Sequence, residues 1–181
     1  MIVKLTKGEL KIIQKMANEI WPICFKEMIS ESQITYMLHW MYNLKTLEDN
    51  FQKGHQFIVF KKDNLYLGFA SFELRKYNNS VRLHKLYVDP SNQNKGTGRV
   101  LLNFVINEGR NAKISKLDLF VNRSNPAVIF YKKLGFKSLE SVDLEIGNGF
   151  YMNDYRMEVE ILLYYACIII LVFIYLNKSI T

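Results

Sequence analysis

Apolar and polar positions in the first fifty residues repeat with the period of an α-helix. Thr6 and Glu9 form a capping box, in which the threonine side chain accepts from the helix amides and the glutamate reaches back. A helix is predicted from this box to about Trp21, where Pro22 interrupts it because proline has no N–H to donate. The apolar face of this helix consists of Leu10, Ile13, Met16, Ala17 and Ile20.

Two shorter helices follow. Ser30 and Gln33 form a second capping box, which opens a helix that runs to about Tyr42. Thr46 is the predicted cap of a third helix that ends near Gly54.

From residue 56 the apolar period becomes that of a β-strand. Helical spacing returns at 98–108 and at 125–134, with Asn125 near the N-cap of the second helix, Pro126 at its first position and Gly135 past its end. This order predicts a single α/β domain whose mixed, mostly antiparallel central sheet is flanked by helices. The predicted strands are 2–5, 56–60, 65–75, 81–88, 116–121, 137–146 and 150–161.

Composition indicates the size of the core, the cellular compartment and the charge of the partner. Apolar residues make up 49% of the 181 residues, which suits one domain with a sizeable core. Cys24 and Cys167 show neither metal spacing nor a disulfide framework, so we expect no metal site and a reducing, cytoplasmic location. The net charge of +7 lies in residues 82–133, where ten Lys or Arg face three Asp or Glu. This excess indicates an anionic partner or a solvated basic face; without a nucleic-acid motif, we expect no nucleic-acid partner.

The segment Gln93-x-x-Gly96-x-Gly98 lies between a predicted strand end and a helix start. Backbone amides at a helix N-terminus point toward one spot, the helix dipole adds positive potential there, and glycine lets an anion approach closely. Lys95 and Arg99 add charge. The loop therefore indicates a phosphate site, although a glycine turn that only starts a helix has the same letters. It matches neither a P-loop nor a Rossmann fingerprint.

Three ordered segments resemble the GNAT superfamily of N-acetyltransferases. Leu86-Tyr87-Val88-Asp89-Pro90 and Gln93-x-x-Gly96-x-Gly98 are similar to the family's motif A. Asn122-x-x-Asn125-x-Ala127-x-x-Phe130-Tyr131-x-x-x-Gly135-Phe136 is similar to its motif B. The resemblance covers residues 1–160, with a spermidine- or diamine-acetyltransferase-like subtype suggested by the closing segment 146–154.

The resemblance implies an acetyl-CoA site. The backbone of Leu86, Tyr87 and Val88 should pair with the pantetheine arm, and Asn122 and Asn125 should lie near the pantetheine and the acetyl group. The remaining residues assigned to the cofactor are Gln93, Asn94, Lys95, Gly96, Thr97 and Gly98, whose amides should hold the pyrophosphate, together with Arg99, Ala127, Phe130 and Lys133.

Two residues are predicted to be catalytic. Tyr131 matches the tyrosine that protonates the departing thiolate in many family members, while the alternative role is that of a packed aromatic residue. His84 lies two residues before Leu86, where related enzymes place a proposed base, and histidine titrates near neutral pH. The alternatives are a structural histidine and Glu73 as the base.

The resemblance implies a primary amine as the acceptor, and we favour a small amine or polyamine over a protein amine. Asp154 is a candidate contact for a substrate ammonium, or else an acid in a surface turn. The early helices contribute aromatic residues that either contact the amine by cation–π interaction or, for most of them, form core. These residues are Trp21, Phe25, Tyr36, Trp40 and Tyr42.

Residues 161–181 follow the predicted domain, and 161–176 (ILLYYACIIILVFIYL) carry no charge. As a helix these sixteen residues would span about 24 Å. A typical transmembrane helix has roughly 20 residues, so the segment is slightly short for one. The alternatives are a membrane anchor, an oligomer element such as a homodimer contact, a packed extension, or a segment without a role. The alternative functions are accordingly a non-catalytic acetyl-CoA sensor and a tail-anchored interaction module of the same fold.

Overall fold

The structure is a computed structural model that describes residues 1–161. Most of the apolar segment 161–176, and with it the predicted anchor or homodimer element, lies outside the described residues. Its first residue, Ile161, is buried, and its N–H donates to the Ser115 carbonyl over 2.7 Å. Ile161 therefore belongs to the core of the domain. Within residues 1–161 no helix is long and apolar enough to cross a membrane.

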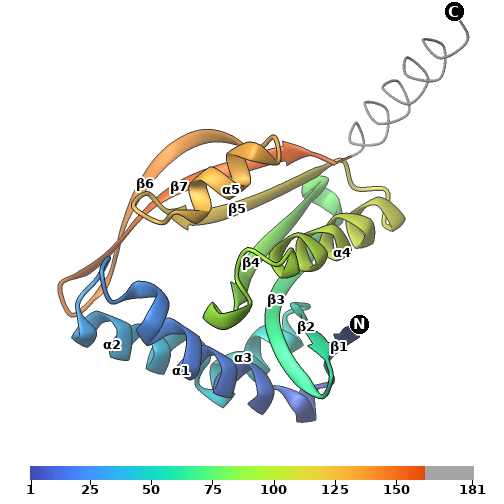
Figure 1. The fold of residues 1–181 in the computed structure, drawn as a ribbon. Coiled ribbons are helices and arrows are strands. Elements are labelled where there is room, and N and C mark those ends of the chain that lie inside the picture. Colours follow the sequence, from blue (N-terminus) through green and yellow to red (C-terminus); the bar gives the residue numbers. More distant parts are fainter. Residues whose placement is uncertain (162–181) are drawn as a thin grey trace, which may run out of the picture.

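Seven strands form one mixed sheet in the described part of the chain (Figure 1). They are β1 (Ile2–Lys4), β2 (Gln56–Lys62), β3 (Leu65–Arg75), β4 (Ser80–Val88), β5 (Lys116–Asn122), β6 (Lys137–Gly147) and β7 (Phe150–Glu160). Their order is β1-β2-β3-β4-β5-β7-β6, and β4 with β5 is the parallel pair. The predicted α/β class and mostly antiparallel sheet are confirmed.

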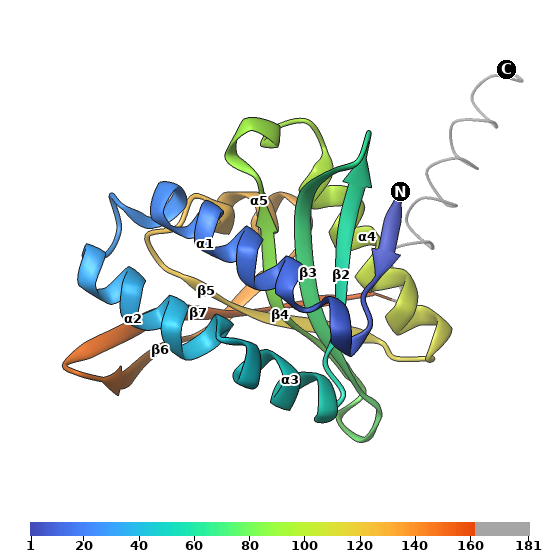
Figure 2. The same ribbon diagram turned by 90° about the horizontal axis from the view of Figure 1, so that it is seen from below.

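Five α-helices cover the two faces of this sheet (Figures 1 and 2). They are α1 (Lys11–Phe25), α2 (Glu31–Tyr42), α3 (Leu44–Gln52), α4 (Thr97–Asn111) and α5 (Ala127–Lys133). The helices α1 to α3 pack a core against one face, and α4 and α5 pack a separate core against the other. The predicted apolar face of the first helix, from Leu10 to Ile20, is buried as expected.

Both predicted ends of the first helix were wrong. Pro22 lies inside α1, on its exposed side. Proline removes one backbone hydrogen bond, but burial of the neighbouring Trp21 and Phe25 stabilises the helix enough for it to continue. The Thr6–Glu9 box caps a 3₁₀ turn at Lys7–Glu9, and α1 begins only at Lys11.

The cap of α3 also differs from the prediction. Asn43, whose Oδ1 accepts from the Thr46 N–H over 2.9 Å, is the N-cap in place of Thr46. The Ser30 cap of α2 is confirmed, since its hydroxyl accepts from the Gln33 N–H over 3.2 Å. The Gln33 side chain does not complete the box, because it donates to the Tyr151 carbonyl across the molecule over 2.8 Å.

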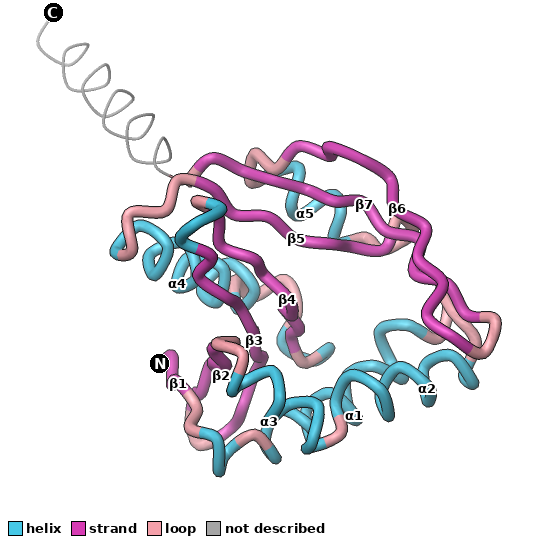
Figure 3. Tube along the Cα trace, turned by 180° about the vertical axis from the view of Figure 1, so that it is seen from behind, coloured by secondary structure: helices cyan, strands magenta, loops and turns pink. Residues whose placement is uncertain are grey.

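Two irregularities of β4 create the space for a site. The β4–β5 pairing ends at Leu83 and Leu119, and beyond this point the two strands diverge (Figure 3). The β3–β4 register passes from Phe72 opposite Leu83 to Ser71 opposite Lys85, so His84 is the extra residue of a β-bulge. A bulge re-aims the side chains that follow it, which here brings His84 and Lys85 toward the same side of the strand.

Candidate active site

A cleft of about 460 Å³ opens where β4 and β5 part. Residues 82–87 of β4 form one wall and residues 119–122 of β5 form the other. The ends are closed by side chains from α1, α2, α3, α5 and β7. The cleft thus reaches from the coenzyme side predicted from the sequence to the predicted acceptor side.

The loop before α4 leaves a row of backbone amides without acceptors. Gly96 is the N-cap of α4 and adopts φ +84°, a left-handed conformation that suits glycine. The N–H groups from Asn94 to Arg99 have no acceptor among residues 1–161. Lys95 turns back and donates to the Ser91 carbonyl over 2.9 Å. Unpaired amides at the positive end of a 15-residue helix fit a pyrophosphate.

The outer part of β4 has one open edge. Leu86, Tyr87 and Val88 pair with β3 on one side, whereas the β4–β5 register stops before them on the other. Their remaining backbone groups are therefore available to an extended ligand, as in the addition of a strand to a sheet. Leu86 and Tyr87 also line the cleft.

The turn between β5 and α5 is held by the two predicted asparagines. Asn122 Oδ1 accepts from the Ser124 N–H over 2.9 Å, and Asn125 Oδ1 accepts from the Ala127 N–H over 2.8 Å. Asn122, Asn125 and Ala127 line the cleft. The N-cap of α5 is Pro126, one residue beyond the predicted cap.

Two further residues assigned to the cofactor differ in their surroundings. Phe130 is half-buried, and its ring lies 3.8 Å from the position that a Cβ on Gly98 would take, so the second and third motif segments meet in space. Lys133 is exposed at the end of α5.

Tyr131 combines burial with access to the cleft. It is 6% exposed and packs edge-on against Phe130 and Phe136, with ring centroids 5.3 Å apart in both pairs. Burial, and then the neighbouring Tyr87, raise the pKa of the Tyr131 phenol above its usual value. The phenol therefore stays protonated at neutral pH and keeps a proton to donate.

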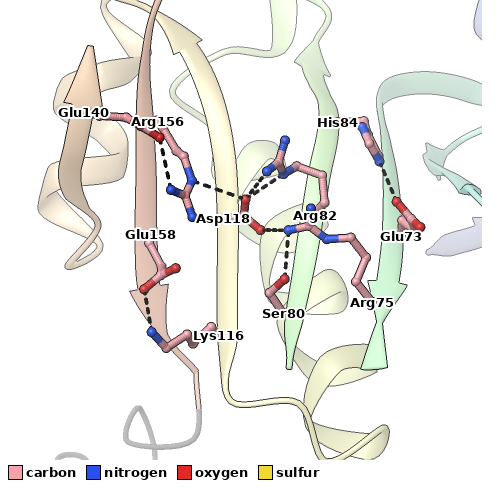
Figure 4. Close-up of polar contacts among 10 residues, drawn as sticks. All are labelled: Glu73, Arg75, Ser80, Arg82, His84, Lys116, Asp118, Glu140, Arg156 and Glu158. Carbon is pink, nitrogen blue, oxygen red and sulfur yellow. Dashed lines mark hydrogen bonds and ion pairs between the residues drawn. The ribbon is translucent and has the colours of Figure 1, made fainter. Parts of the chain in front are cut away.

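His84 stacks on His55 with ring centroids 3.9 Å apart, and its Nε2 lies 3.4 Å from Glu73 Oε2 (Figure 4). That approach lacks hydrogen-bond geometry, and His84 Nε2 has no hydrogen-bond partner among the described residues. Burial, followed by His55 and Lys85, lowers the pKa of His84 to about 3, and Glu73 does not offset this. His84 is thus a neutral imidazole at physiological pH.

These features agree with the comparison to known proteins. The profile of the acetyltransferase (GNAT) domain matches residues 25–159. The chain belongs to the GNAT acetyltransferase family. The GNAT domain is an acyltransferase that uses acetyl-CoA as its co-substrate, and the free amides before α4 and the open edge of β4 fit that group.

Solved GNAT structures share this fold. The PaiA N-acetyltransferase of Thermoplasma acidophilum, in complex with coenzyme A, is 25% identical with a TM-score of 0.74, over 88% of this chain and 98% of that one. Mutant forms of the spermidine/spermine N-acetyltransferase SpeG of Vibrio cholerae are 21% identical with a TM-score of 0.65, over 92% and 97%. The second likeness shows the fold alone, so the polyamine subtype remains a prediction.

A curated relative covers less of the chain. The UPF0157 protein YqkA of Bacillus subtilis strain 168 is 33% identical over 118 residues, which is 62% of this chain and 33% of YqkA. The match thus spans about a third of the length of that relative.

The acceptor end of the GNAT cleft contains two charged residues whose roles could not be assigned from the sequence. Asp154 is 6% exposed in β7 and lines the cleft, so the surface-turn alternative was wrong. Burial raises the pKa of its carboxyl to about 6 against a smaller opposing effect of Arg123. Lys85 is 6% exposed, lines the same cleft, and was not predicted as a site residue. In the sequence, Val81, Leu83 and Lys85 occupy alternate positions of one strand. A lysine at a position where the pattern calls for a buried apolar residue is the signal that could have identified it.

The predicted aromatic residues divide between core and cleft. Trp21 and Phe25 are buried in the core and also reach the cleft wall. Trp40 lines the cleft and is 43% exposed. Tyr36 instead donates its hydroxyl to the Ile146 carbonyl over 2.6 Å, while Tyr42 is buried.

Three metal-type ligands converge beside the cleft. The ligand atoms of His55, Glu73 and His84 lie within 4.8 Å of one another. The charge of Lys85 acts on both histidines and lowers their pKa values, so the local potential is positive. That potential opposes a divalent cation at this position.

Proposed function

We propose that this protein transfers the acetyl group of acetyl-CoA directly to the primary amine of a small molecule. One observation carries the proposal: Leu86 and Tyr87 at the open edge of β4 and the Tyr131 side chain line a single cleft, and the chain continues from this edge to the free amides at the start of α4. Acetyl-CoA supplies an activated acetyl thioester and a thiol leaving group. Every other requirement falls on the side chains and backbone of this chain.

The backbone binds and orients the donor. The amides from Asn94 to Arg99 hold the pyrophosphate, and the open backbone edge of Leu86 to Val88 aligns the extended arm. Asn122 and Asn125 keep the β5–α5 turn rigid through their own oxygens, so their amide nitrogens remain free to donate toward the cleft. Holding two reactants in attack geometry removes much of the entropic barrier.

Tyr131 donates the proton that the departing sulfur requires. Its phenol borders the cleft and is held by packing against Phe130 and Phe136. A positioned general acid typically contributes about 10²- to 10⁴-fold to the rate.

We assign acceptance of the amine proton to Asp154 in preference to His84. An amine must lose its proton before or during attack, and the group that takes it works best with a pKa near the operating pH. The Asp154 carboxyl has a pKa of about 6, lines the cleft, and makes no side-chain hydrogen bond or ion pair among residues 1–161. His84, with a pKa of about 3, is a much weaker proton acceptor.

The pH–rate profile separates these two residues. The acid limb of kcat/KM should lie near pH 6 in the wild type and in His84→Gln, and it should disappear in Asp154→Asn with most of the activity. A limb that persists in Asp154→Asn and is lost in His84→Gln would return the role to His84.

Release of free CoA from acetyl-CoA tests the function itself. The acceptors are alkylamines, diamines and spermidine, amino acids, and peptides with free N-termini. Turnover with a small amine supports the proposal, and the spermidine arm tests the polyamine subtype. A protein that binds CoA but releases none with any acceptor would instead be the non-catalytic sensor.

A further inference from the structure

Lys85 is a buried ammonium that faces the acceptor part of the cleft without an anionic partner. Its Nζ lies 4.6 Å from the centroid of the Tyr42 ring, and within residues 1–161 the ammonium makes no hydrogen bond or ion pair. Burial is the sole cause of the lowering of the Lys85 pKa to about 8, so the side chain still carries its charge at neutral pH. Buried charges are costly and are normally paired.

The neighbouring charges cannot serve as that partner. Asp118, a buried carboxylate on β5, already accepts from Arg82 Nε over 2.7 Å and pairs with Arg75 and Arg82 (Figure 4). Asp154 is the one carboxylate among the described residues that line the cleft. No ion pair joins Asp154 to Lys85, so the cleft lining contains one cation and one anion that each lack an ion-pair partner within residues 1–161.

The cofactor end of the cleft does not account for Lys85 either. Val81 and Leu83 of β4 face the core that contains α4, whereas the β-bulge at His84 turns Lys85 to the opposite face, against Tyr42. The pyrophosphate amides lie at the start of α4. Lys85 therefore points away from the anionic part of the donor and toward the acceptor.

We propose that the acceptor is an amine that also carries a carboxylate, an amino acid in the broad sense, and that Lys85 binds this carboxylate. The proposal rests on the proposed acetyl transfer. Asp154 meets the ammonium end of the acceptor before transfer, and Lys85 meets the other end.

This charge arrangement disfavours a polyamine. A diamine would place a second ammonium near Lys85, with only Asp154 in the described lining to balance two positive charges. Replacement of that second ammonium by a carboxylate converts repulsion into attraction.

Matched acceptors of equal length test the proposal. In 5-aminopentanoate, pentylamine and 1,5-diaminopentane the reacting amine is similar and only the far end changes; α-amino acids and shorter and longer ω-amino acids complete the series. A charge-assisted contact predicts kcat/KM about tenfold or more higher for the best carboxylate than for its alkylamine, with the diamine lowest. A wild-type enzyme that prefers the diamine overturns the proposal.

Variants of Lys85 test the same contact from the side of the protein. Lys85→Met should lower kcat/KM for the carboxylate, through KM, about tenfold more than it lowers kcat/KM for pentylamine, whereas Lys85→Arg should retain the preference. Lys61→Met removes another lysine that contacts a tyrosine ring, outside the cleft lining, and serves as the control. An equal loss with all acceptors would overturn the proposal, since Lys85 would then act on the acetyl group or the fold.

Binding separates this proposal from the proposed function. Titration calorimetry of 5-aminopentanoate and the α-amino acids into the CoA-saturated protein requires no turnover. Binding that is lost in Lys85→Met without any CoA release would support the carboxylate site and refute the acetyl transfer. CoA release from alkylamines, with no carboxylate bound or acetylated, would refute the carboxylate site alone.

Discussion

At the residue scale, burial gives the polar side chains of the cleft their chemistry. It raises the pKa of Tyr131 and moves that of Asp154 to about 6. It also lowers the pKa of Lys85 to about 8. In each case the buried environment favours the uncharged form. The result is a phenol that retains its proton and a carboxyl that can exchange one near neutral pH.

Replacement of Tyr131 by phenylalanine tests its acid role. We expect Tyr131→Phe to lower kcat about 10²-fold or more, because the departing sulfur loses its proton donor. The KM for acetyl-CoA and the melting temperature should change little, since the ring keeps its packing against Phe130 and Phe136. The matched control is Tyr77→Phe, at a residue that is 89% exposed. Equal kcat in both variants would contradict the assignment.

Replacement of Asp154 by asparagine should lower the activity and raise the folding stability near neutral pH. Folding raises the pKa of this carboxyl from 3.8 to about 6, so its contribution to stability is present below pH 3.8 and lost as the pH rises through about 6. At about 1.4 kcal/mol for each pKa unit, ionisation costs the folded state up to about 3 kcal/mol at pH 7.5.

Denaturant unfolding at several pH values measures this effect. Asp154→Asn should be more stable than the wild type at pH 7.5, with the advantage lost by pH 4. If the free energies of unfolding of the two proteins changed in parallel with pH, the pKa of Asp154 would not be raised by burial, and the prediction would be wrong.

At the scale of single elements, the start of α4 fixes the donor site. Gly96 adopts φ +84° and thereby directs the following amides toward one point. Gly149, at φ +72°, occupies the β6–β7 turn, and a Cβ at either glycine would meet no atom within 4 Å. The two positions therefore share the same kind of backbone requirement in different places.

Alanine at these two glycines separates strain from binding. Both Gly96→Ala and Gly149→Ala should lose roughly 1–2 kcal/mol of stability, because a left-handed conformation is costly for residues with a Cβ. Only Gly96→Ala should also weaken CoA binding, by about tenfold if one amide contact to the pyrophosphate is misdirected. Calorimetric titration with CoA measures both variants. Equal weakening in both would indicate a global effect in place of a local one.

At the scale of the whole molecule, the sheet is divided at the site. Strands β1–β4 and β5–β7–β6 are joined by a parallel pairing that spans only Ser80–Leu83 and Lys116–Leu119 (Figure 3). A ligand in the cleft contacts both halves. Its binding energy therefore adds to the cohesion of the domain.

Thermal unfolding with CoA tests that link. At a hundredfold excess over Kd the folded state gains about 2.7 kcal/mol, which for a chain of this size raises Tm by roughly 5–10 °C. At the same concentration as CoA, pantetheine, which lacks the pyrophosphate, should shift Tm less, and added salt should reduce the difference between the two ligands. Equal shifts with both ligands would exclude the α4 amides as the main contact.

The sequence determined what depends on short-range pattern. Periodicity predicted most of the helices and strands, and the two glycines and the motif around Tyr131 indicated the fold family and the loop before α4. Such features depend on neighbours within a few residues, so a single sequence contains them.

Only the tertiary structure decided the properties that arise between distant segments. Pro22 stays helical because its neighbours are buried against the sheet, and the β-bulge at His84 follows from pairing with β3. The same packing leaves His84 a poor base and exposes Lys85 and Asp154 to the cleft from different strands. Electrostatic environment and side-chain direction depend on which surfaces meet, and no local pattern of residue types encodes that.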